Sequence, residues 1–113
     1  MQQTEIKDFA LPEMRVDEST GGSIDERFER FHKLNPWIYE KLVHYARILK
    51  NTGNHKVGIA LAYERLRWDF KVSTFGDDRY KLNNDFQSRY ARLIMQNEPD
   101  LAGIFNIRKL RSE

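Results

Sequence analysis

Cysteine is absent from this chain of 113 residues, and histidine occurs only three times. Without cysteine the chain forms no disulfide and offers no thiolate to a metal ion. His32, His44 and His55 lie on or beside different predicted helices, with none of the paired spacings typical of a metal site. We therefore expect no bound metal and no cofactor, and cysteine usage does not indicate a compartment.

Long apolar runs are missing as well. No run approaches the roughly 18 to 20 residues that cross a bilayer, and the N-terminus lacks the basic-then-apolar order of a secretory signal. These two absences predict a soluble cytoplasmic protein without a membrane partner.

Motifs of catalysis are equally scarce. The sequence contains no glycine-rich phosphate loop and no serine or cysteine set beside a histidine as a nucleophile. Asp77 and Asp78 suit a turn better than a cation site. Asp100 fits the start of a metal-nuclease pattern, but Asn106 stands where the second acidic residue belongs. We predict that the protein is not an enzyme.

What the chain does contain is enough apolar material for one folded domain: 40% of its residues are hydrophobic and 12% are aromatic. Its net charge of +2 conceals an asymmetry. Residues 1–26 carry seven acidic and two basic side chains, whereas the remaining residues carry 10 acidic and 17 basic ones. A basic body suits a polyanion partner, with the acidic segment screening it, and it equally suits an ordinary solvated surface with a solubilising tail.

The first 22 residues show no sustained period and end in "STGG", so we expect a disordered acidic arm over 1–22 and a helical domain over 23–113. Ser23 and Glu26 form the capping-box pattern "SIDE", which predicts a helix from about Ile24 to Lys33. Asn35 as cap, Pro36 at the first position and Gly53 as exit predict a second, central helix.

A third helix is predicted by "VGIALAYERLRWDF", whose apolar stripe runs through Ile59, Tyr63 or Ala62, Leu66 and Phe70. Trp68 fits either the core or the surface edge of this helix. The next segment reads as a loop, with a short strand at Lys71 to Phe75 as one alternative.

Asn84 with Gln87 caps a fourth helix that ends before Pro99, followed by a further turn and a short strand signal at Phe105. Together these segments predict a mainly α fold. We expect a compact four- to five-helix domain, winged-helix-like, with a short C-terminal strand or hairpin.

The fourth helix has a polar side that is our candidate nucleic-acid surface. Arginine, glutamine and serine side chains there suit base edges, and the basic residues before and after the helix suit phosphates. A solvated amphipathic helix shows the same composition. The connection from the third helix, roughly 12 residues, is also longer than the 3 or 4 of a helix-turn-helix. The candidate nucleic-acid-binding residues are Arg79, Lys81, Asn84, Gln87, Ser88, Arg89, Arg92, Gln96, Arg108, Lys109 and Arg111.

The order of the segments "ERFERFHKLNPWIYEKLVHYARILKNTG", "VGIALAYERLRWDF" and "YKLNNDFQSRYARLIMQNEPDLAGIFNIRKL" resembles that of short, mostly uncharacterised bacterial and phage or prophage proteins. The resemblance covers about residues 26 to 111. It implies a microbial or viral origin and one compact helical domain, and it carries no residue roles.

These observations lead to a non-catalytic protein that binds duplex DNA, as a phage or prophage regulator. The alternative from another class is a phage-encoded protein-interaction module that modulates a host complex, because the acidic arm includes the apolar insertions "FALPEM". A homodimer is the third alternative, through an apolar patch around Trp37, Tyr63 and Trp68.

Overall fold

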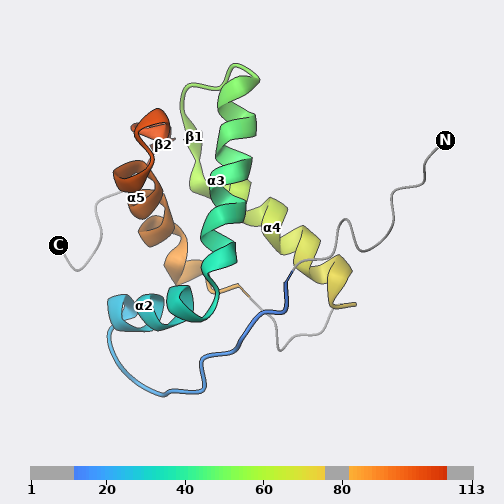
Figure 1. The fold of residues 1–113 in the computed structure, drawn as a ribbon, viewed down its shortest axis with the longest axis vertical. Helices are drawn as coiled ribbons and strands as arrows, with labels where there is room; N and C mark the ends of the chain where they lie inside the picture. Colours follow the sequence, from blue (N-terminus) through green and yellow to red (C-terminus); the bar gives the residue numbers. More distant parts are fainter. Residues whose placement is uncertain (1–11, 76–81, 107–113) are drawn as a thin grey trace.

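A computed structural model of the chain describes residues 12–75 and 82–106, and Figure 1 shows its arrangement. Within these ranges the fold is mainly helical and compact, as predicted. Its α-helices are α2 (Ile24–Leu34), α3 (Pro36–Asn51), α4 (Ile59–Ser73) and α5 (Gln87–Asn97). The shorter elements are the 3₁₀ turns η2 (Asn84–Phe86) and η3 (Pro99–Leu101) and the strands β1 (Val57–Gly58) and β2 (Phe105–Asn106). Among the described helices, none combines the length and apolarity needed to cross a membrane.

The predicted capping box begins α2. The Ser23 hydroxyl accepts a hydrogen bond from the Glu26 backbone N–H at 3.1 Å, and the Glu26 carboxylate accepts one from the Ser23 N–H at the same distance. These bonds satisfy two backbone donors that a helix start leaves without partners. They also hold the pKa of the Glu26 carboxyl below its usual value.

The ends of α4 and the start of α5 differ from the sequence prediction. No strand forms at Lys71 to Phe75, because α4 continues to Ser73 and Thr74 closes it by donating its N–H to the Phe70 carbonyl at 2.9 Å. Before α5, the cap is Asn83 rather than Asn84: the Asn83 side chain accepts from the Asp85 N–H at 2.8 Å and starts η2. A 3₁₀ turn therefore precedes the α-helix.

The short C-terminal strand is confirmed, and among the described residues it pairs in parallel with a distant strand and forms no hairpin. β2 pairs in parallel with β1, with Val57 opposite Phe105, and the Val57 N–H donates to the Ile104 carbonyl at 2.8 Å. Parallel strands need a long connection, here α4 and α5, whereas a wing is made of adjacent antiparallel strands. The described strands therefore do not supply the wing of a winged helix.

The core lies where α3 and α4 meet α5. Ile38, Leu42, Leu66 and Tyr90 are each fully buried, and the Tyr90 ring stands edge-on to Phe28 with 4.8 Å between centroids. Aromatic edge-to-face pairs add specific geometry to this burial. Phe28 thus docks α2 against α5.

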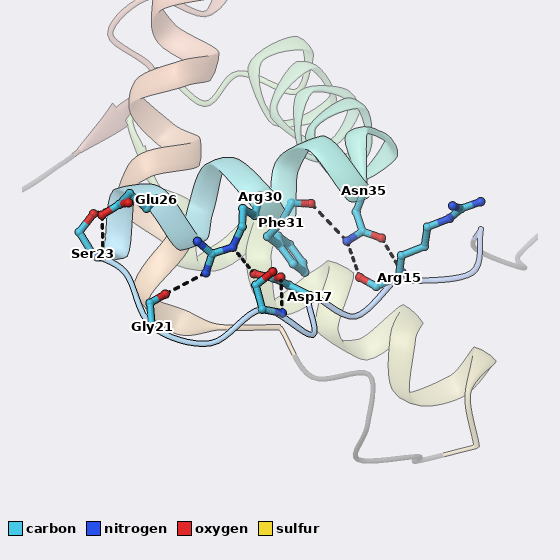
Figure 2. A network of polar contacts seen from close by, with 9 residues as sticks. Arg15, Asp17, Gly21, Ser23, Glu26, Arg30, Phe31 and Asn35 are labelled. Carbon is cyan, nitrogen blue, oxygen red and sulfur yellow. Dashed lines mark hydrogen bonds and ion pairs between the residues drawn. The ribbon is translucent and has the colours of Figure 1, made fainter.

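Residues 12–22 depart from the expected disordered arm, because they form an irregular strap held against the domain (Figure 2). Met14 in this strap is buried in the core. The Arg15 N–H donates to the Asn35 side-chain oxygen at 2.7 Å, and the Asn35 amide donates to the Arg15 carbonyl at 2.9 Å and to the Phe31 carbonyl at 3.2 Å. Asn35 therefore clamps the strap instead of capping α3 through its side chain.

A second attachment holds the strap further along. The Arg30 guanidinium donates to the Asp17 carboxylate at 2.8 Å and to the Gly21 carbonyl at 2.9 Å, as the dashed lines in Figure 2 mark. This pairing keeps the pKa of the Asp17 carboxyl below its usual value. Residues 1–11 of the predicted arm lie outside the described residues.

The Asn35 clamp leads to a stability prediction. Asn35→Ala removes the amide partner of the part-buried Arg15 N–H and of the Arg15 and Phe31 carbonyls, so we expect the free energy of unfolding to fall by roughly 1–3 kcal/mol. Urea denaturation measures the loss. Asn51→Ala, at an exposed position near the end of α3, is the matched control and should change stability by less than about 0.5 kcal/mol.

The same variant should expose the strap to protease. Trypsin cleavage after Arg15 should be faster in Asn35→Ala than in the wild type, because detachment then competes with closure. Equal cleavage rates together with an unchanged unfolding midpoint would show that the amide does not hold the strap.

Acid sensitivity should arise at His32. Its ring stacks on Phe28 at 5.9 Å, and burial lowers its pKa from 6.5. Because the unfolded chain then takes up the proton first, the histidine contributes stability above pH 6.5 that is lost as the pH falls toward the lowered folded value. In His32→Phe the free energy of unfolding should depend less on pH between roughly pH 5 and 6.5, where carboxylates contribute little to that dependence. An unchanged slope in pH-dependent urea denaturation would contradict this assignment.

Candidate functional site

The predicted nucleic-acid residues on α5 and η2 do not form an open polar face. Among them, Asn84 and Gln96 are exposed, whereas Gln87, Ser88, Arg89 and Arg92 are partly buried. The phosphate-holding residues that the sequence suggested lie outside the described residues; they are Arg79, Lys81, Arg108, Lys109 and Arg111.

Arg89, one of the candidate nucleic-acid-binding residues, is engaged within the fold. Its Nε donates to the Asp25 carboxylate at 2.7 Å, and its side chain is only 12% exposed. The Asp85 carbonyl accepts a further, longer bond at 3.4 Å. Arg89 therefore joins the start of α5 to the acidic first turn of α2. The helical period of residues 84–97 gave no sign of this, because the partner lies 64 residues earlier.

Other arginines of the basic body are also paired internally. Arg47 bridges Glu98 at 2.7 Å and Asp100 at 3.0 Å, so it fastens α3 to the end of α5 and to η3. The Tyr39 hydroxyl donates to the same Glu98 at 2.7 Å, and burial together with this bond raises the pKa of Tyr39 to about 12. Ion pairs within the described residues include those of Arg30, Arg47, Arg65, Arg67 and Arg89.

A different surface stands out on α4. Seven large apolar side chains are exposed in the described residues, and four of these lie on α4 or just beyond it: Leu61 (56% exposed), Trp68 (69%), Val72 (60%) and Phe75 (96%). Single exposed apolar residues are ordinary, whereas a group on one element indicates a contact surface. We call these four residues the α4 stripe. Trp68, which the sequence left undecided, thus belongs to the surface.

Helix geometry places the three α4 members of the stripe on one side of the helix. Leu61, Trp68 and Val72 are separated by seven and four residues, so at 3.6 residues per turn they point the same way. The opposite side of α4 buries Ile59, Tyr63, Leu66 and Phe70 against the core. In Figure 1 the C-terminal half of α4 extends away from α2 and α5. The helix α4 therefore has two apolar sides: one packs against the core, and the other, which carries the stripe, is exposed.

An apolar groove borders the stripe where α3 and α4 meet; its lining residues are Tyr45, Ile48, Leu49, Leu61, Ala62 and Arg65. The Arg65 guanidinium lies 5.8 Å from the centre of the Tyr45 ring and 3.5 Å from the Asp69 carboxylate. The Tyr45 hydroxyl donates to Asp69 at 2.7 Å, and burial with this bond raises the pKa of Tyr45. These contacts fix the rim of the groove.

Within residues 12–75 and 82–106, histidines and carboxylates form no group that could hold a metal ion. The exposed remainder of the α5 polar side and the α4 stripe with its groove are the candidate contact surfaces in the described part of the chain. Nucleic-acid binding through α5 and its flanking residues stays a prediction.

The Asp25–Arg89 pair should be measurable as a coupling energy. In a double-mutant cycle of Asp25→Asn and Arg89→Gln, we expect about 0.5–1 kcal/mol, because Asp25 is exposed and water screens the pair. Chemical denaturation gives the four stabilities. A control cycle of Asp25→Asn with Arg65→Gln, on another helix and paired elsewhere, should give a coupling near zero. Equal values in the two cycles would remove the structural role of Arg89.

Comparisons with known protein families, with curated proteins and with solved structures find no match to this chain. The resemblance to short bacterial and phage proteins accordingly stays a prediction, and the function is argued from the surface of the molecule itself.

Proposed function

We propose that this protein is a non-catalytic interaction module that binds a protein surface through the α4 stripe. The observation that carries the proposal is the concentration of exposed large apolar side chains on one side of one helix. A helix face of this kind is the usual complement of another amphipathic helix or of an apolar groove.

Removing the apolar side chains of the stripe from water would stabilise a complex. Burying a side chain such as Val72 or Leu61 stabilises a complex by roughly 1.5–3 kcal/mol, and tryptophan is the residue most enriched among binding hot spots. Trp68 lies between these residues along the helix, with charged residues on either flank. An apolar centre with a polar rim is the usual anatomy of a protein interface.

Phe75 strengthens the case. It follows the last turn of α4 with a φ of +55°, in the left-handed region where glycine is the usual residue, and its ring is 96% exposed. Within the described residues the ring contributes nothing to the core that offsets this backbone cost. Burial of the Phe75 ring in a contact with a partner would offset this backbone cost.

Duplex DNA is the less favoured partner. Base reading by α5 would need Arg89 to leave Asp25, and several other arginines are committed to carboxylates. The remaining support for DNA is the basic surplus after residue 26, of which residues 27–75 and 82–106 carry a net +5 and residues 76–81 and 107–113 a net +2.

Trp68→Glu tests the proposal, because it puts a charge at the centre of the stripe without touching the core. In nuclease-treated extracts of cells that express the tagged protein, we expect the wild type to retain a protein partner and the variant to lose it. The isolated variant should keep its helical circular dichroism spectrum, since an exposed side chain contributes little to folding.

Val16→Glu is the matched control, because Val16 is a similarly exposed apolar residue (52%) on the strap. It should retain the same partners as the wild type. The proposal is wrong if Trp68→Glu retains them too, or if nuclease treatment alone removes every partner, which would return the argument to nucleic acid.

A further inference from the structure

We propose that the partner of the α4 stripe is a second copy of this chain, with two α4 helices packed antiparallel about a twofold axis. This inference rests on the proposed function and names its occupant. The evidence is the spacing of the stripe, the charges in and beside it, and the position of the axis that they define.

The spacing is that of a coiled-coil seam. Leu61, Arg65, Trp68 and Val72 follow one another at intervals of four, three and four residues. This alternation keeps one narrow line of side chains facing a partner helix. Arg65 lies in the line among apolar neighbours and is itself exposed (64% of its side chain).

The charges decide the relative direction of the helices. In a parallel pair each seam residue meets its own counterpart, so Arg65 would face Arg65 of the second copy and Glu64 would flank Asp69 of the second copy. Both contacts bring like charges together. The parallel arrangement is therefore disfavoured.

In an antiparallel pair the seam residues alternate. Leu61 then meets Val72 of the second copy, and Arg65 meets Trp68 of the second copy, where a guanidinium over an indole face is attractive. A twofold axis makes every contact occur twice, so one helix face supplies both halves of the interface. The stripe is self-complementary in this direction alone.

The flanking charges agree with the same register. Glu64 and Lys71 lie on one flank of the seam, seven residues apart. The antiparallel register places Glu64 beside Lys71 of the second copy, twice. Glu64 uses one carboxylate oxygen for Arg67 of its own chain, and among the described residues Lys71 has no ion pair.

The axis of this register passes between Leu66 and Arg67, at the middle of α4. The two helices therefore overlap along their whole length. Phe75 of the second copy comes to the start of α4, next to Leu61 and the groove that contains Ile48. In this register the exposed Phe75 ring of one copy packs against the apolar groove of the other copy.

Sedimentation equilibrium of the full chain tests the inference. Over micromolar concentrations we expect the wild type to approach twice the 13.5 kDa chain mass, and Trp68→Glu to stay at 13.5 kDa. The melting temperature of the wild type should rise with protein concentration, and that of Trp68→Glu should not. Val16→Glu should behave as the wild type.

A charge exchange tests the register. Glu64→Lys should raise the dimer dissociation constant roughly tenfold, because two attractive pairs become repulsive. Adding Lys71→Glu should restore it. A carboxylate at residue 71 also lies four residues from Arg67 of its own chain, so rescue in the double variant does not isolate the contact between copies. A mixture of the single variants Glu64→Lys and Lys71→Glu isolates it, because their heterodimer pairs opposite charges across the axis twice and should form more tightly than either homodimer.

The possible results separate the two proposals. A wild type that stays at the monomer mass overturns the second copy as occupant; if Trp68→Glu nevertheless loses a captured protein, the proposed function stands with another partner. A dimer that survives Trp68→Glu overturns the assigned face. A dimer that Glu64→Lys leaves unchanged, or that the double variant fails to restore, overturns the antiparallel register.

Discussion

The amide of Asn35 is the contact on which the arrangement of the first half of the chain depends. It is fully buried, and it joins the strap, the end of α2 and the start of α3 by bonding to the backbone of Arg15 and Phe31. A buried amide stabilises a structure only when its hydrogen bonds are made, so the corner has one good geometry. That geometry holds the strap against the corner between α2 and α3.

Local signals in the sequence predicted the helices well, but they did not predict which side chains far apart in the sequence form hydrogen bonds or ion pairs. The capping box at Ser23 and the glycine exit at Gly53 involve residues a few positions apart, and both were placed correctly. Asn35 was read as a helix cap because asparagine before proline usually is one, yet its partner Arg15 lies 20 residues earlier. Arg89 was read as a surface residue for the same reason, since Asp25 is far away in sequence. Periodicity shows which side of a helix is apolar, but not which polar side chains will meet.

The charge asymmetry takes on a different meaning in the folded chain. Two acidic residues of the first 26, Asp17 and Asp25, pair with Arg30 and Arg89 of the basic remainder. Residues 1–26 therefore neutralise part of the basic remainder through fixed contacts. Charges used in this way hold elements together and are correspondingly less available to a polyanion, which is why the positive surplus alone is a weak argument for nucleic acid.

The two apolar sides of α4 could not be told apart by composition, because both follow a helical period. Burial distinguishes them: the side with Ile59, Leu66 and Phe70 packs on α3 and α5, whereas Trp68 and Val72 remain in water. A helix that needed only to support this core would carry polar residues at those positions, since they are no less compatible with the helix and cost nothing in hydration. The stripe has the alternating four and three spacing of a seam, with opposite charges one heptad apart on its flank. Glu64 and Arg65 already pair with Arg67 and Asp69 of their own chain, whereas Trp68 and Val72 remain exposed. The proposed antiparallel pair of α4 helices would cover these apolar side chains and place Glu64 beside Lys71 of the second copy.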